Sequence, residues 1–227
     1  MSLVLLTGAS RGIGRATALY LAEQGVELIL LGRASVEQRQ TENILADRRT
    51  RFASYTCDFF ERESVDRALS EILEKGEIPD ALIHNAAIIE RASVLETTDE
   101  SWDRQMEVNL RAPLRVTRAL LPPMLQRKSG RIVFVSSISA VLGSKNQSAY
   151  HASKAGLLGA MRCLAEELSD TGLSTTALLP GAVDTQMLQG SAFPPRMSPQ
   201  DVAKTLAFYA LEAPTAHNGG IVELFGT

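Results

Sequence analysis

Tyr150 and Lys154 lie four residues apart in a segment with helical periodicity, so both side chains share one face of that helix. A free tyrosine has a pKa of about 10, which is too high for a base at neutral pH. A nearby ammonium group stabilises the phenolate and lowers this pKa. Tyr150 could then donate a proton to a carbonyl oxygen or take one from an alcohol. The spacing alone is common on helix surfaces, so its meaning depends on the surrounding chain.

Ser137 stands thirteen residues before Tyr150, where a predicted strand over residues 132–136 ends. A hydroxyl at that place could form a hydrogen bond to a substrate oxygen and hold it beside the phenol. The three side chains together predict an active site that reduces a carbonyl group or oxidises an alcohol.

A glycine-rich turn supplies a second chemical signal. The residues Thr7-Gly8-Ala9-Ser10-Arg11-Gly12-Ile13-Gly14 follow an apolar run and open a predicted helix. Glycines let a backbone turn tightly and approach a pyrophosphate, and the helix N-terminus offers free N–H groups. The spacing differs from the general dinucleotide fingerprint, and a purely structural turn is the alternative. The strand before it and the helix after it favour a dinucleotide site, where Lys154 could reach the nicotinamide ribose.

The type of dinucleotide depends on the end of the second predicted strand. A carboxylate there would bind the adenosine ribose, whereas an arginine would pair with a 2′-phosphate. The chain has Gly32-Arg33 at this point, with no acidic residue at the tip, and Arg11 adds a second positive charge. Solvated surface charges are the alternative for both arginines. The two cations and the missing acid favour NADP(H) over NAD(H).

Short apolar runs alternate with longer amphipathic segments along the chain. The runs predict strands over residues 3–6, 27–31, 51–56, 81–84, 132–136, 174–179 and 221–224. The amphipathic segments predict helices over residues 12–24, 36–47, 61–75, 99–126, 149–168 and 199–211. This alternation indicates parallel strands joined by helical crossovers, with helices on both faces of one sheet. Pro122-Pro123 should kink or end the long fourth helix.

The overall composition limits the possible partners. A chain of 227 residues with 45% hydrophobic residues fits one α/β domain over residues 1–227. The net charge of −3 gives no reason to expect nucleic acid or an anionic membrane as a partner. The first residues read as a strand rather than a signal peptide, and no apolar run approaches the roughly eighteen residues of a membrane span. Cys57 and Cys163 form no metal or redox motif, which predicts a cytoplasmic protein with reduced thiols and no metal.

These motifs resemble those of the short-chain dehydrogenase/reductase family, in its ordinary branch with a Tyr-x-x-x-Lys active site. The resemblance covers nearly the whole chain: the glycine turn, Asp58 after the third strand, Asn85-Ala86-Ala87, Ser136-Ser137 and the segment from Tyr150 to Lys154 all match in order. Residues 180–185, with the sequence PGAVDT, resemble the segment that holds the nicotinamide carboxamide. Ala87 stands where the family has glycine, and the last strand lacks the usual Asp-Gly-Gly.

The resemblance implies a Rossmann-like, doubly wound sheet of seven parallel strands in a single domain. It also implies a catalytic tetrad of Asn109, Ser137, Tyr150 and Lys154, in which Asn109 binds a water of the proton relay. The implied cofactor-binding residues are Gly8, Ser10, Arg11, Gly12, Ile13, Gly14, Arg33, Asp58, Asn85, Ala86, Tyr150, Lys154, Pro180, Gly181, Val183 and Thr185. Among them, Asp58 would contact the adenine, and the Val183 backbone and the Thr185 hydroxyl would contact the nicotinamide.

We therefore expect an NADP(H)-dependent oxidoreductase that reduces a ketone or aldehyde, or catalyses the reverse reaction, on a small-molecule substrate. Reduction of a 3-oxoacyl group on a carrier protein is one alternative, and a catalytically silent NADP-binding sensor is another. The predicted substrate pocket is apolar and carries Ile88, Ile89, Val141, Leu142, Met187, Leu188 and Phe193. Lys145 and Arg196 could meet an anionic group, although exposure to solvent is the simpler interpretation of both.

Three further expectations concern packing. The helices over residues 99–126 and 149–168 resemble those that form a two-fold subunit contact in this family, which predicts a homodimer or homotetramer. His84, at the end of a buried strand, should be a hydrogen-bonded core residue rather than a catalyst. Cys163 should be a small, buried apolar group.

Overall fold

The computed structural model describes residues 2–226, which form one parallel sheet with the strand order β3-β2-β1-β4-β5-β6-β7. The strands are β1 (Leu3–Thr7), β2 (Glu27–Gly32), β3 (Phe52–Thr56), β4 (Ala81–His84), β5 (Gly130–Val135), β6 (Leu173–Pro180) and β7 (Gly220–Leu224). The helices are α1 (Gly12–Glu23), α2 (Val36–Asp47), α3 (Arg62–Glu74), α4 (Asp99–Met106), α5 (Ala112–Arg127), α6 (Ser148–Glu167) and α7 (Pro199–Leu211). The predicted fold class is confirmed.

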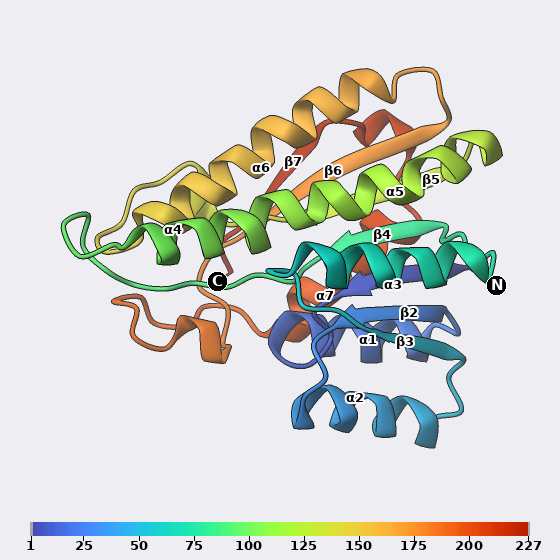
Figure 1. Cartoon of the computed structure of the whole chain (residues 1–227), viewed down its shortest axis with the longest axis horizontal. Coiled ribbons are helices and arrows are strands. Elements are labelled where there is room, and N and C mark those ends of the chain that lie inside the picture. The colour runs from blue at the N-terminus through green and yellow to red at the C-terminus, as the bar shows by residue number, and fades with distance from the viewer. Residues whose placement is uncertain (1, 227) are drawn as a thin grey trace.

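Helices cover both faces of the sheet (Figure 1). One core joins α3, α5 and α6 to the sheet, with side chains such as Phe134 and Met161 that are fully buried. A second core joins α1, α2 and α7 to the opposite face, around side chains such as Leu30 and Leu206. Strands covered on both faces read as continuous apolar runs, which is why the sequence pattern located them within a residue or two.

The strand order reverses between β1 and β4, since the chain first builds outward to β3 and then crosses to the other side of β1. In open α/β sheets, ligands bind beyond the carboxyl ends of the strands at such a reversal. The loop of residues 85–98 and the loop of residues 181–198 both extend beyond this edge (Figure 1). The fold therefore places the predicted site between these loops and the glycine turn.

The predicted long helix over residues 99–126 is interrupted. A π-helical turn, Glu107–Arg111, separates α4 from α5 and carries Asn109. The Pro122-Pro123 pair does not end the helix where it stands, because α5 continues to Arg127 and stops at Lys128, whose φ is +56°. The pair lies in the last turns of α5 and removes two N–H donors there, and the helix continues for one further turn.

Two further features bear on the sequence-based expectations. Cys163 is exposed on α6, so the prediction that it is buried is wrong; its neighbour Leu164 occupies the position that faces the core. Within residues 2–226, no helix combines the length and the apolar character that a bilayer crossing needs.

Candidate active site

The glycine turn packs backbone against backbone. Gly8 has a φ of +73°, and a Cβ atom added to it would lie 2.9 Å from the Cα of Ala86. A Cβ atom at Gly14 would lie 2.0 Å from the Gly8 carbonyl oxygen and 2.5 Å from the side-chain nitrogen of Asn85. Neither position has room for a side chain. A turn packed this tightly directly before the N-terminus of α1 fits the pyrophosphate of a dinucleotide, which helix N-termini bind through free N–H groups.

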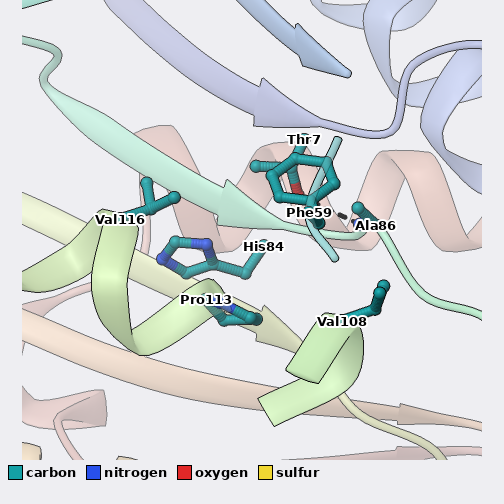
Figure 2. Close-up of a pocket in the computed structure, with 7 residues that line it drawn as sticks. All are labelled: Thr7, Phe59, His84, Ala86, Val108, Pro113 and Val116. Carbon is teal, nitrogen blue, oxygen red and sulfur yellow. Dashed lines mark hydrogen bonds between the residues drawn. The ribbon is translucent and has the colours of Figure 1, made fainter. Parts of the chain in front are cut away.

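Asn85 and Thr7 hold this turn against the end of β4. The Asn85 side-chain amide donates to the carbonyl oxygens of Thr7 and Gly8, both at 3.0 Å. The Thr7 hydroxyl oxygen accepts from the backbone N–H groups of Asn85 and Ala86, also at 3.0 Å, and Figure 2 draws the second of these bonds. The Asn85 amide therefore holds the glycine turn in shape. The direct contact between Asn85 and a cofactor stays a prediction.

The glycine turn also contacts the loop after β6. A Cβ atom at Gly12 would lie 3.2 Å from the Thr185 Cγ2 atom, although the two residues are far apart in sequence. An open groove of about 400 Å³ lies here, and Arg11, Gly12, Asp184 and Thr185 are among the residues that line it. Ser10 and Ile13 are half-buried beside it, and Ile13 packs against the core under α1. The structure thus brings two predicted cofactor segments together.

The predicted cations lie on the surface near the end of β2. Arg33 is exposed just after β2, and Arg11 is exposed and donates to the side chain of Gln186. Arg15, which sequence reasoning missed, donates through Nε to the Thr41 hydroxyl at 2.9 Å. The Asp58 carboxylate accepts from the N–H of Phe60 at 3.0 Å and so caps a turn. An adenine contact by Asp58 stays a prediction.

Ser137, Tyr150 and Lys154 come together at the carboxyl end of β5. Lys154 is 2% exposed, and its ammonium donates to the Val135 carbonyl oxygen at 2.8 Å and lies 5.7 Å from the centre of the Tyr150 ring. The Ser137 hydroxyl oxygen accepts from the N–H of Ser139 at 3.1 Å, which directs it toward the start of the following turn. The predicted grouping of a phenol, an ammonium and a hydroxyl is present.

The pKa of Tyr150 is raised, whereas the sequence analysis expected it to be lowered. Burial raises the pKa of the Tyr150 phenol above its ordinary value, while the Ser137 hydroxyl and the positive charge of Arg91 act in the opposite direction. Burial also lowers the pKa of Lys154 to about 7, so this group is only partly charged at neutral pH. The cation that favours the phenolate in this structure is therefore Arg91, on which the sequence analysis made no prediction.

Asn109 connects the loop after β4 to α6. Its side-chain oxygen accepts from the Ile88 N–H at 2.8 Å, and its amide nitrogen donates to the Ile88 carbonyl at 2.9 Å and the Ser153 hydroxyl at 3.1 Å. The Ser153 hydroxyl in turn donates to the Tyr150 carbonyl oxygen at 2.7 Å. The π-helical turn brings Asn109 into this position beside Ser153 of α6. Its role toward a water stays a prediction.

The segment after β6 forms the remaining wall. Pro180 is buried, and its carbonyl oxygen lies 3.5 Å from the Ser137 hydroxyl. The Gly181 N–H donates to the Leu224 carbonyl at 2.8 Å, which ties the segment to β7. The Val183 side chain is buried, and the Thr185 hydroxyl donates to the Val183 carbonyl at 3.4 Å. Beyond Thr185, the loop exposes Met187 and Phe193 to solvent.

His84 lies beneath the glycine turn, with Phe59, Ala86 and Val108 around the same hollow (Figure 2). The hollow is too small for a water molecule. The His84 Nε2 atom lies 2.8 Å from the Thr117 hydroxyl, and the ring stacks on Phe134. Its Nδ1 atom has no hydrogen-bond partner in the part of the chain that the structure describes. The expectation of a hydrogen-bonded core histidine therefore holds for one ring nitrogen only, and burial lowers its pKa to about 3.

Sequence reasoning missed two residues that matter at the site. Arg91 spans from the loop after β4 to Met187, whose carbonyl oxygen accepts from the Arg91 Nη2 at 2.9 Å. Gln105 is fully buried on α4 and bonds both the N–H and the carbonyl of Glu90. Neither residue belongs to a recognisable motif. An arginine within an apolar loop segment was the available signal for the first, and a glutamine on the buried face of a helix was the signal for the second.

Comparisons with known proteins show to which family the chain is similar. A family model described as short chain dehydrogenase matches residues 2–193. An uncharacterized oxidoreductase of Staphylococcus saprophyticus is 34% identical over 94% of this chain and 92% of its own length. A 3-oxoacyl-[acyl-carrier-protein] reductase of Synechocystis is 30% identical over 95% of this chain and 92% of its own length.

Solved structures are similar over almost the entire chain. A putative NAD(P) dependent gluconate 5-dehydrogenase from Beutenbergia cavernae, with bound NADP at low occupancy, superposes with a TM-score of 0.91 at 29% identity and covers 98% of this chain and 94% of its own. A 3-oxoacyl-[acyl-carrier protein] reductase from Brucella melitensis with bound NAD gives a TM-score of 0.89 at 26% identity, over 99% of this chain and 90% of its own.

Proposed function

Because the chain belongs to the short-chain dehydrogenase family, we propose that it catalyses NADP(H)-dependent reduction of a ketone or aldehyde, or the reverse reaction, with Tyr150 as the general acid or base. The protein is an oxidoreductase of this family and acts on CH–OH or C=O groups. The grouping of Tyr150, Ser137 and Lys154 at the end of β5 supports the role of Tyr150 as the general acid or base.

In this proposal the proton moves at the phenolic oxygen of Tyr150. During reduction, Tyr150 donates its proton to the substrate oxygen, and during oxidation it accepts one from the alcohol. The raised pKa keeps the phenol protonated at neutral pH, which suits the reductive direction. The Ser137 hydroxyl orients the substrate oxygen, and Asn109 fixes the backbone of Tyr150 through Ser153.

The tight turn at Gly8 and Gly14, directly before the N-terminus of α1, fits a dinucleotide, and bound NADP(H) would supply or accept the hydride at its nicotinamide ring. Gly12 and Thr185 would flank it, since they meet across the open groove. Lys154 donates one proton to the Val135 carbonyl, which leaves its remaining protons for a ribose hydroxyl. Arg11 and Arg33, exposed near the end of β2, support NADP(H) as the preferred cofactor.

Replacing Tyr150 with phenylalanine tests the proton donor. The Tyr150→Phe variant should keep its fold and its NADPH affinity but lose at least about 100-fold in turnover, the usual scale of acid–base catalysis. NADPH absorbance with a panel of ketones, aldehydes and quinones measures this. Tyr209→Phe is the matched control, because it removes a phenolic hydroxyl on α7. Near-normal turnover by Tyr150→Phe would assign the proton to another group.

A double substitution tests the cofactor preference. A guanidinium paired with a phosphate should contribute roughly 1.5–3 kcal/mol, or about 10- to 100-fold in affinity for NADPH over NADH. Gly32→Asp with Arg33→Ala should reverse this order, because the phosphate then meets a like charge and the ribose gains an acceptor. Fluorescence titration of both cofactors, repeated at high salt, measures the ratio. Equal affinities in the native protein would show that the 2′-phosphate is not recognised.

Reduction of a carrier-bound 3-oxoacyl group is a second candidate, which the Synechocystis relative favours by its name. The basic residues that could dock an acidic carrier are largely occupied, however. Arg127 donates to the carbonyls of Ile78 and Pro79, and Arg131 donates to that of Ala213. A carrier-linked acetoacetyl thioester should therefore react no faster than the same thioester on a small carrier fragment. A large preference for the full carrier protein would instead favour this candidate.

A two-fold assembly is part of the same proposal. The helices α4 and α6 leave Trp102, Gly159 and Cys163 on an outer surface that a second copy could cover. Light scattering at micromolar concentration should give a mass of twice or four times the 24.6 kDa chain. A monomeric mass would contradict the assembly and leave the proposed chemistry unaffected.

A further inference from the structure

Arg91 is a cation near the reacting groups that lacks an anionic partner. It extends from the loop after β4, is half-buried, and reaches the Met187 carbonyl in the loop after β6. Its Nε atom is buried and forms no hydrogen bond within residues 2–226. A buried guanidinium N–H without an acceptor is unfavourable, because burial removes water and nothing replaces it. The protein therefore leaves most of the hydrogen-bonding capacity of this guanidinium unused.

The carboxylates nearest in sequence do not neutralise Arg91. Glu90 is exposed, and its carboxylate lies 3.7 Å from the guanidinium of Arg104 instead. None of the ion pairs formed among the described residues includes Arg91. The positive charge acts on Tyr150, where it favours the phenolate. Arg91 thus forms no structural ion pair among the described residues, and its hydrogen bond to Met187 places its guanidinium between the loops after β4 and β6.

The backbone on both sides of Arg91 is fixed. Gln105, fully buried on α4, accepts from the Glu90 N–H at 3.1 Å and donates to the Glu90 carbonyl at 3.3 Å. On the other side, the Ala92 N–H donates to the Asn146 carbonyl at 3.0 Å. A loop held at both neighbours presents its side chain in a defined direction, and a preorganised guanidinium loses little freedom when it binds an anion.

We propose that Arg91 binds a carboxylate of the substrate, so that the enzyme prefers carbonyl compounds that carry a carboxylate near the reacting carbon. This inference rests on the proposed function and adds the class of substrate to it. The Met187 carbonyl takes one proton of Nη2, and the guanidinium forms no other hydrogen bond within residues 2–226. Both terminal nitrogens therefore keep protons that can be donated to the two oxygens of a carboxylate.

The test compares acids with their esters. Acetoacetate and levulinate are each assayed against the corresponding methyl ester, with the full-length protein and NADPH. The native enzyme should prefer the acids, and Arg91→Met should lower kcat/KM for the acids by about 10- to 100-fold while esters change by less than about twofold. Arg91→Lys, which keeps the charge but loses the fork, should fall between the two. Arg67→Met, which removes an exposed charge from α3, should leave the acid-to-ester ratio unchanged.

A purely structural role for Arg91, through its bond to Met187, gives a different outcome. Loss of that bond would lower kcat/KM for acids and esters equally, and this result would overturn the proposal. Calorimetric measurement of levulinate binding, with NADP⁺ present, tests the carboxylate site separately from the proposed catalytic function. If no carbonyl compound is reduced but levulinate binding is lost in Arg91→Met, the proposed function fails and the carboxylate site stands. Equal levulinate binding by both proteins overturns the carboxylate site.

Discussion

The two loops that enclose the site are built differently. In the glycine turn after β1, backbone lies directly against backbone, and Asn85 bonds two successive carbonyls. Beyond Thr185, the loop after β6 is attached through long side chains, with Arg91 reaching Met187 and Arg11 reaching Gln186, and it exposes Phe193 to solvent. A rigid glycine turn suits a ligand that does not vary, such as the proposed cofactor. A loop attached through side chains can change its residues more freely, which suits the binding of a particular substrate.

The largest expected effect lies in the glycine turn. Gly14→Ala would bring a Cβ atom to 2.0 Å from the Gly8 carbonyl oxygen, which Asn85 holds in place. The turn would have to shift, at a cost of about 3 kcal/mol in the free energy of unfolding, the upper end for overpacking. NADPH affinity should fall with it. Urea denaturation and a cofactor titration measure both.

Gly143→Ala is the matched control for that substitution. No atom lies within 4 Å of a Cβ added at Gly143, which precedes α6 on the surface. The free energy of unfolding should change by less than about 0.5 kcal/mol. Equal losses for both variants would mean that the glycine turn is no more tightly packed than an ordinary surface loop.

Acid should lower the free energy of unfolding through His84, which is buried beneath the glycine turn. The buried His84 has its pKa lowered to about 3 from an ordinary value of 6.5, so the unfolded chain binds one more proton between these values. Its contribution to stability is fully present above pH 6.5 and is lost as the pH falls toward 3, at up to about 1.4 kcal/mol per pH unit. His84→Asn should remove this part of the acid slope in urea denaturation. His217→Gln, at an exposed position, should leave the slope unchanged.

The smallest effect on stability is expected in the substrate loop. Phe193 is 58% exposed, so Phe193→Ser should change the free energy of unfolding by less than about 0.5 kcal/mol. If Phe193 covers the substrate, loss of even one methylene-sized contact, worth about 0.8 kcal/mol, should raise KM about fourfold. Thermal melts and steady-state kinetics measure the two quantities. A large loss of stability would remove the contrast between the two loops.

Sequence patterns were enough to predict the parts of the molecule whose structure depends on residues that are close in sequence. Strands buried on both faces, the glycine turn, and Tyr150 one helical turn from Lys154 all follow from residue type and spacing. The π-helical turn at Asn109, the exposure of Cys163 and the position of Arg91 did not, because each depends on packing between segments distant in sequence. The electrostatics of Tyr150 were misjudged for the same reason, since its cation comes from another loop.

The contact between Gly12 and Thr185 also has a consequence for synthesis of the chain. The groove beside the glycine turn has one wall from the start of the chain and one from its last quarter. A nascent chain on the ribosome, made at about 5–20 residues per second, therefore carries half a groove until the segment after β6 has emerged. During that interval the free amides at the start of α1 face water rather than a second wall. A ligand that contacts both walls can thus be bound only by a chain that is nearly complete, and its binding would stabilise the folded state.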